Sequence, residues 1–254
     1  MGVTSCGGEG DDPWTPAGGA GGTSASSGTG GTSASSGTGG TGGTSTQSCD
    51  DPAIHSGEAT YYDFADGTGN CSFDASPNDL MIGAMNHTDY AGSAACGACV
   101  ELTGPNGAIT IRIVDRCPEC PAGDIDLSPE AFAEIAELSA GRVPITWHYV
   151  DCSLTGPIVY HFNEGSNQWW TAVQIRNHRR AIASLEYRDG DGAYVAVPRE
   201  DYNFFVEPAG MGPGPYAFRV TDVTEAELED EGIPFIEAGD SSGAGQFPEC
   251  VPGG

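Results

Sequence analysis

The sequence contains no lysine. Nine arginines stand against 36 aspartates and glutamates, which gives a formal net charge of −27 at pH 7. A chain of this charge is repelled by the phosphates of nucleic acids and by anionic membranes, so neither is expected as a partner. One acidic run, Glu225–Glu231, is predicted to be a solvated loop.

Long apolar runs are missing as well, and no stretch is long and apolar enough to span a membrane. The first 50 residues are instead rich in glycine, serine and threonine, and the string G-T-S-A-S-S-G-T-G occurs at 22–30 and again at 31–39. Repeats this short and polar cannot bury a core. Residues 1–50 are therefore predicted to form a flexible tether.

Near its start the chain reads V-T-S-C-G-G, from Val3 to Gly8, which is similar to the end of a bacterial lipoprotein signal. This makes Cys6 a candidate for lipidation; the alternative is a stray cysteine in a tail. A lipid on Cys6 would hold the folded part of the chain at the cell surface through the tether.

Two carboxylates follow a predicted strand in an unusual arrangement. Isoleucine alternates with other residues over 109–113, which predicts a strand that delivers Asp115 at its end. A Cys-Pro-Glu-Cys loop leads to Asp126, and a helix begins directly afterwards with Ser128 as its N-cap and Pro129 as its first residue. Two acids at the rim of a small β domain are typical of a polysaccharide-cleaving site or a descendant of one. The alternative is that Asp115 ends a strand and Asp126 ties down a loop.

The nine cysteines allow two interpretations. Cys96-x-x-Cys99, 17 residues, and Cys117-x-x-Cys120 satisfy the spacing of a four-cysteine zinc site. Two further cysteines bracket the same segment, and the start of the chain is typical of an exported protein, where cysteines at this density are usually oxidised. We therefore favour disulfides and expect no metal and no cofactor, with zinc as the alternative.

Several strings between about residues 54 and 250 stand out together. They are G-E-A-T-Y (57–61), C-G-A-C-V-E-L-T-G-P-N-G (96–107), V-D-R-C-P-E (114–119), D-I-D-L-S-P (124–129), V-P-I-T-W-H-Y-V (143–150), E-G-S-N-Q-W-W-T-A-V-Q-I-R-N-H (164–178), D-Y-N-F-F (201–205) and Q-F-P-E (246–249). These strings resemble the expansin superfamily, specifically its bacterial and fungal expansin-like proteins. The resemblance implies a mostly β chain, with a six-stranded double-psi β-barrel at 51–154 and an immunoglobulin-like, carbohydrate-binding β-sandwich at 155–250.

The resemblance also implies a pairing of the cysteines. It pairs Cys71 with Cys96, Cys99 with Cys152, and Cys117 with Cys120. The remaining candidates, Cys49 and Cys250, flank the folded region and could pair with each other, which would leave Cys6 unpaired.

For the groove of the barrel, the resemblance implies Asp115 as the key residue, with Thr60 and Asp126 orienting a glucan. Family-45 endoglucanases share this barrel, and their acid corresponds to Asp126 or its neighbourhood. Their base would fall on Phe64, four residues after Thr60. Strand alternation turns the neighbouring Asp63 to the other face. We therefore expect a groove that binds glucan without activating water.

Two other positions near the groove bear on whether it can cleave or stack on a glucan. Glu58 shares the strand face of Thr60 and is the one carboxylate that stays a candidate base. Two positions after the key aspartate, where the family often has an aromatic residue, this chain has Cys117. One stacking surface is therefore expected to be missing.

In the second domain, the resemblance implies that Trp169, Trp170 and Tyr202 form an exposed aromatic platform. Flat rings stack on the apolar faces of pyranoses with little help from charge. The alternative is that one tryptophan packs in the core and the other is exposed. Residues 176–178 are predicted to continue the same strand and to finish its polar face or hydrogen-bond a ligand.

These observations predict an extracellular, monomeric protein, secreted or tethered through a lipidated Cys6. It would bind cellulose and other neutral β-glucans, bind pectin-like acidic polymers weakly, and loosen the packing of glucans without hydrolysis. The alternatives are an endoglucanase, a lytic transglycosylase that acts in the same groove on peptidoglycan, and an adhesin that only binds carbohydrate.

Overall fold

The computed structural model describes residues 48–49, 53–63, 65–249 and 251–252. The chain divides into two units, Met1–Thr44 and Ser45–Gly254, and everything described below belongs to the second. Lipidation at Cys6 and all of the tether predicted over 1–50 except Ser48–Cys49 lie outside the described residues; Ser48–Cys49 form a short strand rather than part of a tether. Phe64 and the pairing of Cys49 with Cys250 also lie outside the described residues, since the side chain of Cys49 is not described and Cys250 falls in a gap.

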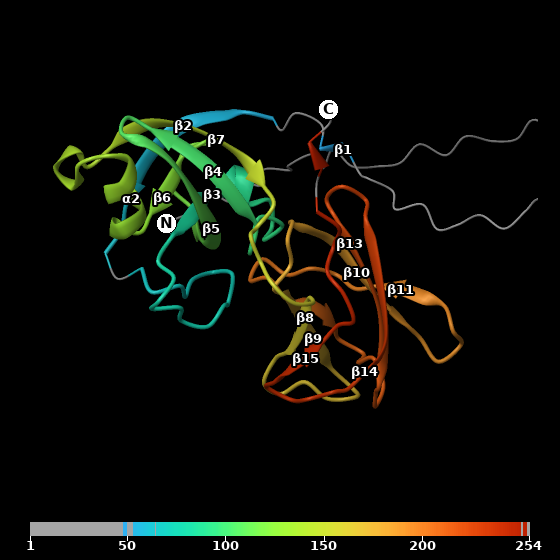
Figure 1. Cartoon of the computed structure of the whole chain (residues 1–254). Helices are drawn as coiled ribbons and strands as arrows, with labels where there is room; N and C mark the ends of the chain where they lie inside the picture. Colours follow the sequence, from blue (N-terminus) through green and yellow to red (C-terminus); the bar gives the residue numbers. More distant parts are fainter. Residues whose placement is uncertain (1–47, 50–52, 64, 250, 253–254) are drawn as a thin grey trace, which may run out of the picture. The chain divides into compact units, whose positions relative to one another are not determined.

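The first half of the described region is the six-stranded barrel that the resemblance predicts (Figure 1). Its strands close in the order β2-β6-β3-β5-β4-β7, with β2/β6 and β3/β5 parallel and the other pairs antiparallel. The bounds are β2 (His55–Tyr61), β3 (Ile82–Asn86), β4 (Cys99–Gly104), β5 (Gly107–Cys117), β6 (Ile125–Leu127) and β7 (Val143–Val150).

The barrel core follows from alternation along the strands. In β5, Ile111 and Ile113 are buried, and in β7 every second residue from Val143 to Trp147 is buried. Helix α2 (Pro129–Ile135) adds the side chain of Phe132 to the same core. The predicted start of α2 is confirmed: the hydroxyl of Ser128 accepts a hydrogen bond from the N–H of Ala131, and proline follows at the first helical position. Short helices α1 (His87–Tyr90) and η1 (Leu138–Ala140) complete the unit.

The second half is a β-sandwich of two four-stranded sheets, as predicted, with sheet orders β11-β10-β13-β14 and β12-β9-β8-β15. Aromatic and aliphatic side chains from both sheets, among them Tyr160, Phe162, Val173 and Phe218, fill the space between them. The bounds are β8 (Val159–Phe162), β9 (Thr171–Arg176), β10 (Ile182–Arg188), β11 (Tyr194–Ala196), β12 (Phe205–Glu207), β13 (Tyr216–Asp222), β14 (Glu227–Ile233) and β15 (Asp240–Ser242). Two short end strands, β1 (Ser48–Cys49) and β16 (Val251–Pro252), pair in parallel.

Two local predictions are wrong. The acidic run Glu225–Glu231 is not a solvated loop, because most of it forms strand β14 at the edge of a sheet. Its glutamates are exposed, which suits an edge strand, while Asp230 is buried and accepts a hydrogen bond from the hydroxyl of Tyr160. Residues 176–178 do not continue one strand either. Strand β9 ends at Arg176, and Asn177 turns the chain with a positive φ of 53°.

The three disulfides implied by the resemblance are confirmed. Cys71 is bonded to Cys96, Cys99 to Cys152, and Cys117 to Cys120. The four cysteines with zinc-like spacing are therefore all joined in disulfides, and the zinc alternative is wrong. Within the described ranges, no group of three or more histidine, cysteine or carboxylate side chains is placed to hold a metal ion. None of the helices described is long and apolar enough to cross a membrane.

Candidate functional site

The register of the barrel strands places the predicted groove residues side by side. Thr60 in β2 lies opposite Asp126 in β6, Asp126 lies opposite Ala84 in β3, and Ala84 lies opposite Asp115 in β5. Residues opposite each other in paired strands share a face of the sheet. We call these four residues the carboxyl row. The small side chain of Ala84 separates the two acids, and the three polar members are each partly exposed.

A bulge in β5 completes the carboxyl row. Gly83 pairs with Ile113, but the next residue, Ala84, pairs with Asp115, so Val114 is the extra residue of the longer strand. A regular ladder would have placed the buried Val114 opposite Ala84. The bulge therefore brings a carboxylate into the row where the strand pattern alone would give an apolar side chain.

The environment of Asp126 raises the pKa of its carboxyl. The hydroxyl of Thr60 donates a 2.5 Å hydrogen bond to Oδ1 of Asp126. Burial raises the pKa of this carboxyl above its usual value, and the negative charges of Glu119 and Asp115 act in the same direction. The Thr60 bond and the cation of Arg142 only partly oppose them. A carboxyl that keeps its proton to a higher pH can donate a hydrogen bond or a proton to a glycan oxygen.

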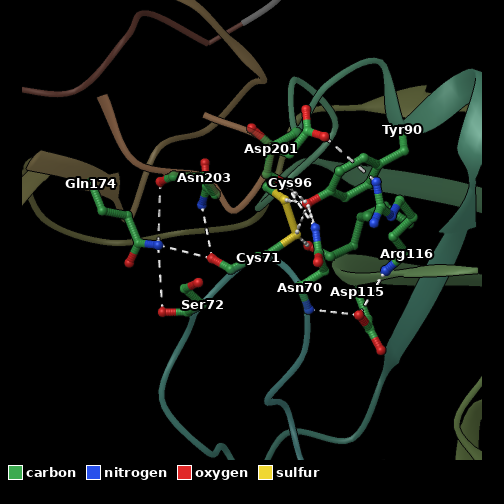
Figure 2. The surroundings of a disulfide bond; sticks show 12 residues. Asn70, Cys71, Ser72, Tyr90, Cys96, Asp115, Arg116, Gln174, Asp201 and Asn203 are labelled. Atoms are coloured by element: carbon green, nitrogen blue, oxygen red, sulfur yellow. Dashed lines mark hydrogen bonds and ion pairs between the residues drawn. A yellow bond between two sulfur atoms is a disulfide. The ribbon is translucent and has the colours of Figure 1, made fainter. Parts of the chain in front are cut away.

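Asp115 is held differently. Its Oδ1 accepts hydrogen bonds from the backbone N–H groups of Asn70, at 2.6 Å, and Arg116, at 2.8 Å (Figure 2). The loop can come this close because residue 69 is glycine: a Cβ there would lie 2.5 Å from both Cβ and Cγ of Asp115. Oδ2 has no hydrogen bond among the described residues and can accept one from a ligand.

The other carboxylates that the sequence offered lie outside the row. Glu58 is exposed and forms a 2.8 Å ion pair with Arg142, and its position in β2 is opposite Pro144 of β7 rather than β6. Strand β2 ends at Tyr61, so the alternation argument does not apply to Asp63, which lies exposed in the following turn. The carboxylate of Glu58 is thus engaged by Arg142, and Asp63 lies beyond the end of the strand.

Sequence reasoning missed Tyr62. Its hydroxyl is buried and has no hydrogen-bond partner among the described residues. Burial raises the pKa of this phenol, and the negative charges of Asp115, Asp126 and Asp66 add to the effect, which places the hydroxyl near both acids. Because buried hydroxyls are normally paired, this one is a candidate donor to a ligand. Tyr62 directly follows the last residue of β2, so strand alternation could not have identified it.

The three aromatic residues predicted to form a platform differ in how far they are exposed. Trp169 has 72% of its surface exposed and Tyr202 has 42%. Trp170 is half-buried and packs on an apolar cluster of Ala172, Phe204 and Val206. The exposures lie between the two predictions: Trp169 is exposed, and Trp170 is neither fully exposed nor part of the core between the sheets.

The two exposed rings occupy equivalent positions in two tight turns. Trp169 is the third residue of the turn Asn167–Trp170, in which the N–H of Trp170 donates to the carbonyl of Asn167. Tyr202 is the third residue of a second turn, in which the N–H of Asn203 donates to the carbonyl of Glu200. Such short loops restrict the backbone, so both rings are presented by well-defined turns.

Comparison with known proteins identifies the family. The model of a family described as lytic transglycolase matches residues 55–147, which is most of the barrel. The chain is 36% identical over 205 residues to the expansin YoaJ of Bacillus subtilis, covering 77% of this chain and 88% of that protein. The chain belongs to the expansin family. Expansin-like protein 2 of Dictyostelium discoideum is 30% identical, and the match covers 80% of this expansin and 52% of the Dictyostelium protein.

Solved structures agree with this assignment. The apo expansin of Clavibacter michiganensis is 31% identical and superposes with a TM-score of 0.72, covering 77% of this expansin and 98% of the neighbour. A mutant of the same Clavibacter expansin, solved in complex with cellohexaose, is 30% identical with the same TM-score and coverage. A match of this length includes parts of both the barrel and the sandwich.

A cavity of 460 Å³ in this expansin lies away from the carboxyl row, since neither Thr60, Asp115 nor Asp126 lines it. Two of its lining arginines are paired with lining aspartates: Arg176 with Asp74 at 2.8 Å, and Arg112 with Asp79 at 3.8 Å. These charges compensate each other, so the cavity has no net charge from them that would select an ionic ligand. The candidate site is therefore the carboxyl row together with the aromatic platform.

Proposed function

We propose that this expansin binds cellulose and related neutral β-glucans and loosens their packing without hydrolysis. The observation that carries the proposal is the composition of the carboxyl row: it holds two acids, Asp126, whose pKa is raised, and Asp115, which is fixed by two backbone N–H groups. The cellohexaose complex of the Clavibacter neighbour supports a glucan as the ligand.

Hydrolysis with inversion needs an acid and a base about 6.5–9.5 Å apart, with a water molecule held by the base. In this row, Oδ1 of Asp115 is already committed to the N–H groups of Asn70 and Arg116. Glu58 is paired with Arg142, and the position that holds the base in family-45 endoglucanases carries Phe64. The acid is therefore present without a partner suited to activate water.

The same groups are suited to compete for hydrogen bonds between glucan chains. When Asp126 carries its proton it can donate to a glucan oxygen, while Oδ2 of Asp115 can accept from a glucan hydroxyl, and the hydroxyl of Tyr62 is a further donor. Rings at Trp169 and Tyr202 add apolar stacking that needs no charge. A chain bound in this way has exchanged its contacts with neighbouring chains for contacts with the protein, which is a physical route to loosening without bond cleavage.

We also propose that this expansin acts outside the cell as a monomer, with a barrel module at 51–154, a sandwich module at 155–250 and residues 1–47 as a tether carrying the candidate lipid site Cys6. Three disulfides are typical of an oxidising compartment. The −27 charge disfavours pectin and other acidic wall polymers.

One observation favours a second function. The barrel matches a family described as lytic transglycolase, and the raised pKa of Asp126 is the property that a general acid requires. A lytic transglycosylase needs no water, because a hydroxyl of the sugar itself attacks. Peptidoglycan would be the substrate. The third reading, an adhesin, requires only the platform and no function of the carboxyl row.

A combined assay separates these functions. One sample is tested for reducing ends released from soluble β-glucan, for fragments released from peptidoglycan, and for extension of cellulose paper under load. We expect only the paper to respond, and we expect Asp115→Asn and Asp126→Asn to abolish that response while cellulose binding persists. Sustained sugar release that Glu58→Gln abolishes indicates an endoglucanase, peptidoglycan fragments indicate the transglycosylase, and binding without extension indicates an adhesin.

A further inference from the structure

The two residues that hold Asp115 by their backbones also hold the aromatic platform by their side chains. Asn70 and Arg116 donate their N–H groups to Oδ1 of Asp115. The side-chain amide of Asn70 donates to the carbonyl of Asp201 at 2.8 Å, and Nη1 of Arg116 lies 3.8 Å from Oδ2 of Asp201 (Figure 2). Asp201 directly precedes Tyr202. The carboxyl row and the platform thus share two supporting residues.

Tyr90 closes this contact into a triangle of hydrogen bonds. Nδ2 of Asn70 donates to the hydroxyl of Tyr90, and that hydroxyl donates to the carbonyl of Asp201, both at 2.8 Å. The amide group has two hydrogens, the hydroxyl has one, and the carbonyl has two lone pairs, so every donor in the triangle has an acceptor. Tyr90 is fully buried, and the guanidinium of Arg116 lies over its ring at 5.5 Å. We call Asn70, Tyr90, Arg116 and Asp201 the junction.

Further bonds fix both ends of the turn that carries Tyr202. On one side, the amides of Gln174 and Asn203 donate to the carbonyl of Cys71, at 2.8 and 3.2 Å. On the other side, the hydroxyl of Ser93 donates to the carbonyl of Glu200 at 2.7 Å. The disulfide between Cys71 and Cys96 joins the two barrel segments that make these bonds. The turn is therefore held on each side by parts of the barrel that are covalently linked to one another.

We propose that Asn70 and Arg116 are positioning residues that hold the Tyr202 ring in a fixed register with Asp115, so that one linear β-glucan chain binds the platform and the carboxyl row together. This inference rests on the proposed function and adds a dependence on ligand length. A chain that reaches both sites binds the second as an intramolecular step, with the gain in affinity that a high effective concentration gives. A shorter chain occupies one site and has no such gain.

Asn70→Ala isolates this role, because it removes both side-chain bonds of the junction and keeps the backbone N–H that Asp115 accepts. Affinity is measured by calorimetry for cellotriose and for cellohexaose. We expect the variant to bind cellotriose as the wild type does and to lose about tenfold or more in affinity for cellohexaose. Gln246→Ala is the matched control, because its bonds join residues of the sandwich and the loop before it, outside the junction.

A double-mutant cycle distinguishes positioning from general loosening of the fold. Tyr202→Ala is made in the wild type and in Asn70→Ala, and the loss of affinity for cellohexaose is compared. If the junction sets the register, Tyr202→Ala costs much less in the Asn70→Ala background. Equal costs in the two backgrounds, or an equal loss for both oligosaccharides in Asn70→Ala, overturn the inference.

A second variant tests the same role in case Asn70→Ala fails to fold. Arg116→Gln removes the contact with the Asp201 carboxylate and keeps its own N–H, and it is expected to show the same selective loss for cellohexaose. Folding of each variant is checked by circular dichroism before binding is measured. If the wild type does not bind cellohexaose, the proposed function fails and the inference fails with it. If the wild type binds and both junction variants bind equally well, only the inference fails.

Discussion

Thr60 and Asp126, opposite each other in the parallel pair β2/β6, are joined by a 2.5 Å hydrogen bond in which the hydroxyl donates to the carboxyl. Threonine can donate in this way whether or not Asp126 is protonated on its other oxygen. The bond therefore fixes the orientation of the carboxyl, while burial and the neighbouring negative charges raise its pKa.

This arrangement predicts how stability depends on pH. Since the pKa of Asp126 is raised in the folded protein, the folded state keeps a proton that the unfolded chain has already lost, and this group lowers stability as pH rises through that range. Asp126→Asn keeps the shape and the acceptor for Thr60 but cannot ionise. We expect the variant to melt higher than the wild type at pH 7, with a difference that disappears near pH 3. A variant that melts lower at pH 7 contradicts this account of Asp126.

Cellulose binding should depend on the rings and hardly on charge. Screening in ~0.15 M salt acts beyond ~8 Å, and cellulose is neutral, so added salt should leave binding unchanged or slightly improve it. Replacing Trp169 and Trp170 with alanine should remove most binding, at about 1 kcal/mol or more for each ring. A pull-down on microcrystalline cellulose across a salt series measures both effects.

The two tryptophans should differ in their effect on stability. Trp169→Ala should leave the melting temperature nearly unchanged, whereas Trp170→Ala should lower it, because of the two only Trp170 packs on the apolar cluster.

Gly69 offers a way to disturb Asp115 without changing its chemistry. An added Cβ would lie 2.5 Å from Cβ and Cγ of Asp115, so Gly69→Ala must displace either the loop or the carboxyl. We expect loss of paper extension with cellulose binding retained, since Trp169 belongs to the other module. Gly190→Ala is the control, because a Cβ there meets no atom within 4 Å. Full extension activity in Gly69→Ala would show that the position of Asp115 is not needed.

His178 should govern part of the acid sensitivity. It is buried and its Nδ1 lies 2.6 Å from the carbonyl of Arg180; burial, with help from the charges of Arg199 and Arg112, lowers its pKa to about 4. The unfolded chain takes up this proton near pH 6.5 and the folded one near 4, so stability falls as pH drops through that window, by about 3 kcal/mol in total.

The corresponding variant is His178→Gln, whose amide can still donate to the Arg180 carbonyl. The slope of unfolding free energy against pH between 6.5 and 4, from denaturant titrations, should flatten in this variant. The exposed His87, replaced by glutamine, serves as the control and should leave the slope unchanged. An unchanged slope in His178→Gln would mean that other groups determine acid stability.

The order of elements and the residue types of the site could be predicted, but their register could not. Alternation identified the strand before Asp115, and the cap at Ser128 fixed the helix after Asp126, because both signals are local. The bulge at Val114 is not local: it depends on how β3 packs beside β5, and it decides which residue enters the row. The junction was missed for the same reason, since Asn70 and Asp201 are 131 residues apart and neither has an unusual sequence context.

The acidic composition of Glu225–Glu231 led to the wrong prediction of a loop, for a physical reason. The acidic run around Glu229 has the charge of a loop, yet its alternate residues, Leu228 and Asp230, turn inward and the strand pairs on one side only. At a sheet edge, repulsion among exposed glutamates is tolerated because water surrounds them. Arg219 in the neighbouring strand also lies 2.9 Å from Glu229. Charge alone therefore does not separate a solvated edge from a loop.

The bond between Cys99 and Cys152 has a mechanical consequence. Cys152 lies just after β7, in the segment that leads from the barrel to the sandwich, and its partner lies at the start of β4, which is hydrogen-bonded to β7. When a force pulls the sandwich away from the barrel, tension along the chain reaches the barrel at this segment. The disulfide passes that tension covalently into β4, so β7 is not peeled from the barrel one hydrogen bond at a time. A pull on the sandwich is thus shared by two strands of the barrel instead of acting on β7 alone.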